Sequence, residues 1–192
     1  MRSILSLILL LGTVLVYSQE TGTLEDPRDG QVYKIVTVDI VLEGDVTVKR
    51  TWMAQNLNYE VPDSFCYKNE SAYCEAYGRL YTFKAAVEAC PDGWHIPTIG
   101  EWSLLFRTFG GIHEAGIALQ KGGKSGLDLI PGGFGDPGSV FKNIGISGNY
   151  WDSEKKSDNT SGLVSVQKGS QEIFHSVIGD WHRNSCRCVK DY

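Results

Sequence analysis

The chain has 192 residues, with 18 lysine and arginine residues against 23 aspartate and glutamate residues, and a formal net charge of −5 at pH 7. The basic residues are scattered, and the longest basic clusters are the pairs at 49–50 and 155–156, with no interleaved aromatic residues. A nucleic-acid-binding surface needs a basic patch or stripe, so nucleic acid is excluded as a partner.

The first 18 residues have the pattern of a secretory signal peptide. Arg2 precedes an apolar run over residues 4–16, and Val16 and Ser18 stand at the −3 and −1 positions of a cleavage site. The run is too short to span a bilayer, and no later segment approaches that length. An uncleaved N-terminal anchor is the alternative. The pattern predicts an extracellular, secreted mature chain without a membrane span, for which the periplasm or the cell surface is also a destination.

The mature chain is predicted to form one domain over residues 26–192, after a short lead-in at 19–25. The motif DPRDG at 26–30 is a turn signal that marks the start of the domain. Residues 31–41 and 46–53 are rich in β-branched side chains and flank a glycine-containing turn, which predicts a hairpin. Residues 54–81 are rich in asparagine and tyrosine, and we interpret them as irregular.

Two helices are predicted on either side of the turn within CPDGWHIPTIGEW, residues 90–102. Apolar residues at i, i+3, i+4 and i+7 end at Cys90 and predict a helix over 82–90. Thr98 and Glu101 form a capping box that predicts the start of a second helix, over 98–109, and two glycines end it. A weaker helix is predicted over 113–121.

The rest of the chain is predicted to contain loops and short strands. Residues 122–148 are rich in glycine and also contain packed aromatic and aliphatic residues, which favours an ordered loop region. Short strands are expected at 150–152, 163–167, 172–177 and 185–190. The order of these elements predicts an α+β fold with both ends of the domain in strands.

The five cysteines are Cys66, Cys74, Cys90, Cys186 and Cys188. Export would place them in an oxidising compartment, where disulfides are the default, although spacing alone does not select the pairing. Cys66 and Cys74 flank a short polar loop, and either Cys186 or Cys188 can bridge to Cys90. The alternative is a reactive or metal-binding pair at Cys186 and Cys188. The four histidines show no metal-ligand spacing, so no metal and no cofactor are expected.

Several long blocks resemble the Fibrobacter succinogenes major paralogous domain, a family of secreted bacterial domains. The blocks are DPRDGQVYKIVTV, TWMAQNLNY, YCEAYGRLYTFKAAVEACPDGWHIPTIGEWSLL and RCVKDY, and the resemblance extends over about residues 26–192. The family is similar in turn to the C-type-lectin-like fold. The resemblance implies two helices packed on small antiparallel sheets, disulfides Cys66–Cys74 and Cys90–Cys188, and Cys186 as the free thiol.

The chain departs from the family pattern in two places. Its hairpin, DIVLEGDVTVKR, is longer than the usual short Gly-Asp turn, and Cys186 stands where a small apolar residue is typical. The second departure leaves open which thiol meets Cys90. The family has no established activity, so the resemblance implies fold and compartment rather than function.

The first functional hypothesis is a non-catalytic extracellular binding module for a carbohydrate or a cell-surface partner. The loop-rich half, residues 122–160, is where a lectin-like fold presents ligand contacts, and Tyr150, Trp151 and Trp181 are candidate sugar-stacking aromatics. The alternative for these rings is packing in the core. Asp136-Pro137 and Trp151-Asp152 are only fragments of the lectin calcium motifs, and no carboxylate cluster for calcium is visible.

Two further hypotheses come from other functional classes. HIPTIGEW is similar to a block of formylglycine-generating enzymes, whose chemistry needs a copper-binding thiol pair near the C-terminus, so Cys186 and Cys188 are candidates for such a pair. No GxSxG elbow, Ser/His/Asp arrangement or pair of catalytic carboxylates is evident. A structural or adhesive surface protein without a small-molecule ligand is the third hypothesis.

Overall fold

The computed structural model describes residues 19–138 and 140–192, and the predicted signal peptide lies outside the described residues. Within them the fold is mixed α+β, as expected, and strands predominate over a few short helices. No helix in the described part of the chain has both the length and the apolar character needed to cross a membrane.

The first sheet has five strands in the order β1-β2-β3-β13-β6. Their bounds are β1 (Glu20–Glu25), β2 (Val32–Val41), β3 (Thr47–Met53), β13 (Val189–Lys190) and β6 (Trp94–His95). Strands β2 and β3 form the predicted hairpin, with Ile35 opposite Met53 and Val41 opposite Thr47. The first strand, β1, and the last, β13, both belong to this sheet, so the two ends of the domain lie in strands, as predicted.

The segment expected as a lead-in, residues 19–25, is almost entirely strand β1. It pairs with β2 from Glu20 opposite Thr37 to Glu25 opposite Val32. Five of its six residues are exposed, so this edge strand has no buried face and its sequence carries no alternation of apolar and polar residues. The sequence pattern therefore missed it.

The DPRDG turn joins β1 to β2 and also contacts the rest of the fold. The side chain of Arg28 donates to the buried carboxylate of Asp26, and this hydrogen bond lowers the pKa of Asp26. The same guanidinium donates to the carbonyl oxygens of Ala89 at 2.8 Å and Cys90 at 3.3 Å. The turn thus holds the start of β2 against the region of Cys90.

The second sheet follows the order β11-β10-β9-β12-β5-β4, and β7 joins it beside β9 while pairing with β8. The bounds are β4 (Ser64–Phe65), β5 (Leu80–Tyr81), β7 (Gly132–Asp136), β8 (Val140–Ile144), β9 (Ser147–Ser157), β10 (Thr160–Gln167), β11 (Ile173–Gly179) and β12 (Asn184–Ser185). The glycine-rich stretch expected as a loop thus contains β7, β8 and the start of β9. At Gly133, φ is 69° and an added Cβ would lie 2.5 Å from the Lys142 carbonyl oxygen, so glycine is required there.

Four short helices complete the fold: α1 (Ser71–Tyr77), α2 (Phe83–Ala89), α3 (Ile99–Thr108) and α4 (Ala115–Leu119). Both predicted main helices are present. Thr82 caps α2 by accepting from the Ala85 amide, and α3 starts with the predicted Thr98–Glu101 capping box. Helix α1 was not expected, because Cys74 is its one buried residue and the segment shows no apolar stripe of helical spacing. Short 3₁₀ turns lie at Glu43–Asp45 and Tyr67–Asn69.

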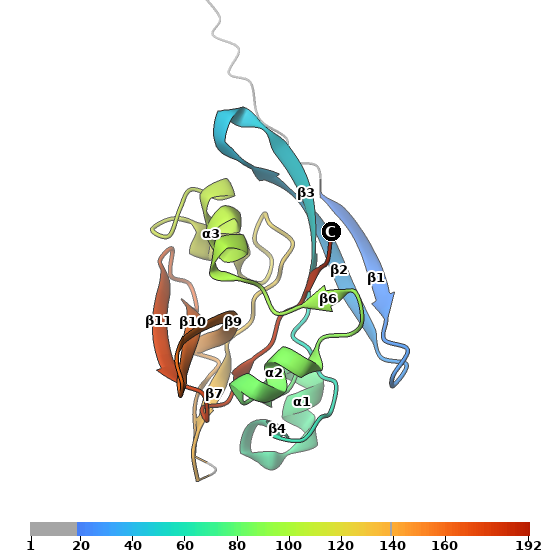
Figure 1. Cartoon of the computed structure of the whole chain (residues 1–192), viewed down its shortest axis with the longest axis vertical. Helices are drawn as coiled ribbons and strands as arrows, with labels where there is room; N and C mark the ends of the chain where they lie inside the picture. The colour runs from blue at the N-terminus through green and yellow to red at the C-terminus, as the bar shows by residue number, and fades with distance from the viewer. Residues whose placement is uncertain (1–18, 139) are drawn as a thin grey trace, which may run out of the picture.

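In Figure 1, β1–β3 stand on one side of the molecule and β9–β11 on the other, with α1 and α2 towards one end. Helix α3 contacts both β2 and β9 and so joins the two sheets. Its side chains Trp102 and Phe106 enter the first core, where the rings of Trp52 and Trp102 lie 5.0 Å apart. A second core beside α2 contains Phe83 and the two cysteines near the C-terminus. Each large side chain buried in this way contributes roughly 1.5–3 kcal/mol.

The disulfides are Cys66–Cys74 and Cys90–Cys188, the pairing that the family resemblance implied. The second joins the residue after α2 to the residue before β13, across a sequence separation of 98. In the loop-entropy model a bridge that closes about 100 residues contributes up to about 4.7 kcal/mol. Cys186 is the free thiol and is buried.

Candidate ligand-binding cleft

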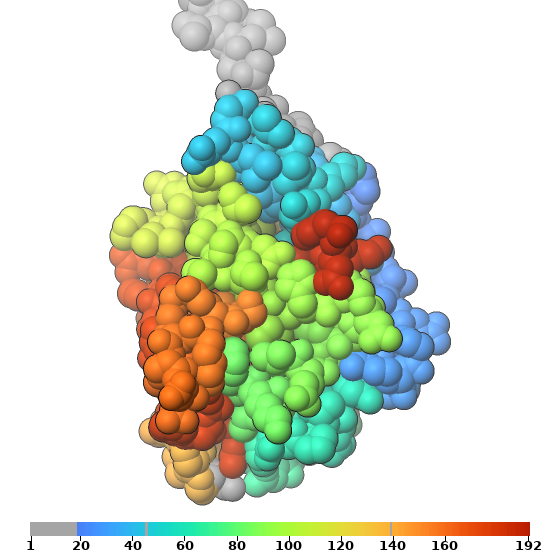
Figure 2. Space-filling view, viewed as in Figure 1, coloured from blue at the N-terminus to red at the C-terminus, as the bar shows by residue number. Residues whose placement is uncertain are grey.

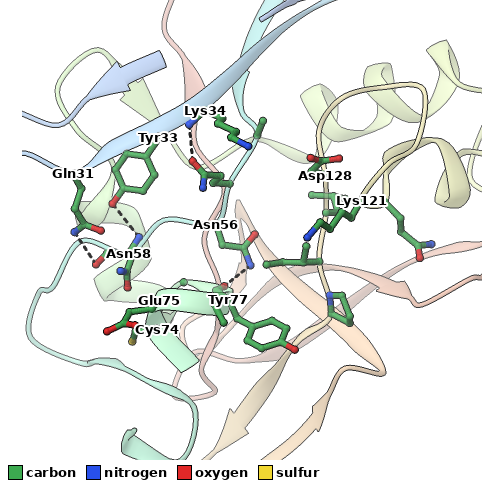
Figure 3. A pocket seen from close by; sticks show the side chains of 18 of the residues that line it. Gln31, Tyr33, Lys34, Asn56, Asn58, Cys74, Glu75, Tyr77, Lys121 and Asp128 are labelled. Carbon is green, nitrogen blue, oxygen red and sulfur yellow. Dashed lines mark hydrogen bonds between the residues drawn. The ribbon is translucent and has the colours of Figure 1, made fainter. Parts of the chain in front are cut away.

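A cleft with a volume of about 740 Å³ opens beside the start of β2, between the end of α1 and the segment at 120–131. One wall is the start of β2 with the following segment at 54–58, a second is the end of α1, and the third is the segment at 120–131 with Gly145 and Lys168. Polar side chains and one partly buried aromatic ring line much of it (Figure 3). These lining residues include Gln31, Lys34, Gln55, Asn56, Asn58, Glu75, Tyr77, Gln120, Lys121, Asp128 and Lys168.

Asn56 forms the floor of the cleft and is buried. Its amide nitrogen donates to the Tyr77 carbonyl oxygen at 2.9 Å and to the Ser185 hydroxyl at 3.3 Å. Its amide oxygen accepts from the Arg187 guanidinium at 2.7 Å. Because both ends of this amide are engaged, Asn56 connects α1, β12 and the C-terminal segment at the base of the cleft.

Arg187 lies directly behind this floor and is fully buried. Its guanidinium donates to the carbonyl oxygens of Leu127 at 2.6 Å, Met53 at 3.0 Å and Asp128 at 3.2 Å. Burial lowers the pKa of Arg187, but an arginine side chain stays charged in proteins. Among the described residues no ion pair includes Arg187, so a positive charge held by neutral oxygens lies under the cleft.

The amide side chains of the cleft walls are held by neighbouring groups. The oxygen of Gln55 accepts from the Lys34 amide at 2.7 Å, and the oxygen of Gln120 accepts from the Gly169 amide at 2.8 Å. The main-chain N–H of Asn58, rather than its side chain, donates to the phenol of Tyr33 at 3.1 Å, and burial raises the pKa of Tyr33 to about 12. These contacts fix the walls before any ligand binds, which reduces the ordering cost of binding.

Tyr77 is the half-buried aromatic residue of the cleft, and it is the last residue of α1. Figure 3 shows its side chain below Asn56, directed away from α1. The helix ends after it because Gly78 has φ 76°, and an added Cβ there would lie 2.7 Å from Cβ of Asn56. The close approach of Gly78 to Asn56 therefore sets the position of Tyr77 beside the cleft floor.

The structure corrects two of the three aromatic residues expected to contact a ligand. Tyr150 and Trp151 are fully buried, one in each core. The Tyr150 phenol donates to the Ile130 carbonyl oxygen at 2.7 Å, and the Trp151 indole donates to the Tyr81 carbonyl oxygen at 2.7 Å. Because β9 lies inside the sheet with a core on each face, successive side chains are buried on opposite sides and no ring faces solvent.

Trp181 is 52% exposed and remains available for contact with another molecule. Its ring lies beside that of His182, with centroids 6.1 Å apart, and neither residue lines the cleft. The structure therefore does not bring the three predicted aromatics together.

The thiols near the C-terminus are close together but unequal. The sulfur atoms of Cys90, Cys186 and Cys188 lie within 4.8 Å of one another, and the Cys186 sulfur is 3.9 Å from that of Cys90. For an in-line attack on the disulfide, the Cys186 sulfur would have to lie about 6 Å from the Cys188 sulfur. The two atoms are at most 4.8 Å apart, so the three sulfurs are not aligned for exchange. Burial raises the pKa of Cys186 to about 12, which keeps it protonated.

The sequence located only part of this cleft. The loop region expected to contact ligand, 122–160, supplies Asp128 and its neighbours, whereas β2, the segment 54–58 and α1 were not expected to contribute. The run AQNLNY was a usable signal, because asparagine and glutamine concentrated in an irregular segment suit hydrogen bonding to a polar ligand. That the run faces α1 depends on tertiary contacts.

The model of the Fibrobacter succinogenes major domain matches residues 47–190, and the chain belongs to this family. No curated protein and no solved structure matches it. The match begins at β3, yet β2 pairs with β3 along seven residue pairs. The structural unit therefore extends before the matched residues to include the two N-terminal strands.

Proposed function

We propose that the protein is an exported, non-catalytic binding module that holds a carbohydrate in the cleft between β2, α1 and the segment 120–131. The observation that carries this proposal is the cleft itself. Its volume of about 740 Å³ lies within the range of small-molecule sites, and several side-chain amides line it together with the half-buried ring of Tyr77.

These residue types suit a sugar. Side-chain amides donate and accept at once, as pairs of neighbouring hydroxyl groups require, and an aromatic ring packs against the apolar face of a pyranose. Export agrees with the N-terminal pattern and with two disulfides, which persist in oxidising compartments. The bridge from the end of α2 to the last strand supports a relation to the C-type-lectin-like fold.

A glycan array probed with the purified chain tests the proposal. We expect reproducible binding that is lost on Tyr77→Ala and retained on Trp181→Ala, because Trp181 is an exposed aromatic residue outside the cleft. Circular dichroism and the urea midpoint of each variant establish that it is folded. Loss of binding on Trp181→Ala alone would place the ligand elsewhere and refute the cleft as its site.

An adhesive or structural role is the second candidate, and one observation favours it. Strand β11 is the edge of the second sheet, and its side chains Phe174 and Val177 are both 50% exposed. An open, partly apolar edge can pair with a strand of another chain. A blank array, together with self-association that Val177→Lys abolishes, would favour this role over ligand binding.

A thiol-dependent enzyme is the least favoured reading. The copper-binding pair suggested by the sequence requires Cys186 and Cys188 to be free together, and in the structure Cys188 is bonded to Cys90. A folded, non-reduced sample that binds one equivalent of Cu(I) would revive this function.

A further inference from the structure

The cleft differs in charge from the rest of the molecule. The chain has a net charge of −5, yet three lysines, Lys34, Lys121 and Lys168, line the cleft against two carboxylates, Glu75 and Asp128. The buried guanidinium behind the floor adds a further positive charge, and it contacts lining residues directly. The local balance is therefore positive on an acidic protein.

The three lysines also lack partners of their own. Lys49, Lys142, Lys155 and Lys156 each form an ion pair with a carboxylate, whereas within the described chain no carboxylate pairs with Lys34, Lys121 or Lys168, nor with Lys68, Lys84 or Lys190 outside the cleft. Of the two cleft carboxylates, that of Asp128 accepts from the Gly122 amide at 2.8 Å. Three amines are thus left to bind an incoming group.

The backbone beneath each lysine is held by hydrogen bonds, so the origin of each side chain is defined. The amide of Lys34 donates to Gln55, that of Lys121 to the Leu129 carbonyl oxygen at 3.1 Å, and that of Lys168 to the Ile146 carbonyl oxygen at 2.8 Å. Figure 3 shows the side chains of Lys34 and Lys121 extending towards the cleft from opposite walls. The positive charges therefore surround the opening rather than forming one row.

We propose that the ligand is an anionic polysaccharide, whose carboxylate or sulfate groups pair with Lys34, Lys121 and Lys168 while its sugar rings lie in the amide-lined cleft. This inference rests on the function proposed above and specifies the chemical class of the ligand. Carboxylate and sulfate share the chemistry that the lysines recognise, and the negative net charge of the chain as a whole disfavours binding of an anion away from the cleft lysines.

The test uses ligands that differ only in charge. Polygalacturonate is compared with its methyl ester, and dextran sulfate with dextran, by affinity electrophoresis and calorimetry. We expect binding of at least one anionic polymer, little binding of its neutral counterpart, and an affinity that falls as salt rises from about 50 to about 200 mM. Which anionic polymer binds distinguishes carboxylate from sulfate recognition.

Substitutions of the lysines test the site. Each of Lys34→Gln, Lys121→Gln and Lys168→Gln should weaken binding roughly 2- to 5-fold, and the triple variant at least about tenfold, because exposed ion pairs are individually weak. The matched control combines Lys68→Gln, Lys84→Gln and Lys190→Gln, three lysines without an ion pair that do not line the cleft, and changes the net charge equally. The control should bind like the unaltered chain.

The outcomes separate this inference from the proposed function. If neutral and anionic polymers bind equally and Tyr77→Ala abolishes both, the cleft binds sugars and the anionic inference is wrong. If the two triple variants weaken binding equally, the attraction is due to net charge, and the cleft lysines have no specific role. If neither the polymers nor the glycan array bind, both proposals fail.

Discussion

Replacement of Arg187 by methionine should destabilise the protein more than any surface substitution. The guanidinium is fully buried and donates to four oxygens, three of them main-chain carbonyls and the fourth the side-chain oxygen of Asn56. Methionine has a similar length but no donor, so these oxygens would lose their shared partner in a site that excludes water.

The magnitude follows from two opposing terms. Each lost hydrogen bond from a charged donor costs roughly 1.5–3 kcal/mol, and four such bonds would sum to more than the stability of many domains. Removing the buried charge also removes its desolvation penalty, which is several kcal/mol. The net loss expected for breaking such a buried charged network is about 3–5 kcal/mol in the free energy of unfolding.

Urea unfolding followed by tryptophan fluorescence measures this loss, with the disulfides intact. The m-value should stay constant, so that the shift in midpoint reports stability alone. Arg187→Lys is the matched comparison, because lysine retains the charge but cannot reach four separate oxygens. Its free energy of unfolding should lie between those of the unaltered chain and Arg187→Met. A loss below about 1 kcal/mol for Arg187→Met would refute the view that this network supports the fold.

Three other predictions follow from individual residues. Thiol titration of the denatured, non-reduced protein should give one reactive thiol, Cys186, and the native protein should react far more slowly because this thiol is buried with its pKa raised to about 12. Partial burial of His95 alone would lower its pKa, but hydrogen bonds to Asp191 and Glu101 outweigh this and raise it. The stabilisation is therefore complete below the unfolded pKa of about 6.5 and is lost as pH rises through the higher folded value, so His95→Gln should cost more stability at pH 5.5 than at pH 8.5. Gly78→Ala should cost at least about 1–3 kcal/mol, because φ is 76° and the new Cβ would lie 2.7 Å from Cβ of Asn56.

Each of these predictions has its own control. Two or more thiols in the denatured sample would contradict the Cys90–Cys188 bridge and favour the thiol-enzyme hypothesis. His95 joins α3 to the chain end, which lies on the surface beside the β2–β3 hairpin in Figure 2. An equal loss of stability of His95→Gln at both pH values would show that the charge of His95 does not stabilise the fold. At Gly78, the control is Gly30→Ala, where φ is also positive but nothing lies within 4 Å of the added Cβ.

Much of the fold could be predicted because its signals are local. The capping box at Thr98 and Glu101, the helical spacing that ends at Cys90 and the β-branched hairpin each depend on neighbours in the sequence, and all three are present. Strand β1 and helix α1 could not be predicted in this way, since the strand is exposed along nearly its whole length and the helix buries only Cys74. The pairing of Cys90 with Cys188 rather than Cys186 came from family resemblance, and the residues alone left it open.

The sequence by itself determined the class of fold, the family and the chemistry available to the chain: acidic overall, rich in amides after β3, with five cysteines. Only the tertiary structure decided where that chemistry lies. It buried Tyr150 and Trp151 because β9 has a core on each face, and it assembled the cleft from segments as far apart in the chain as Gln31 and Lys168. Burial and the meeting of distant segments depend on packing between elements, which no local pattern encodes.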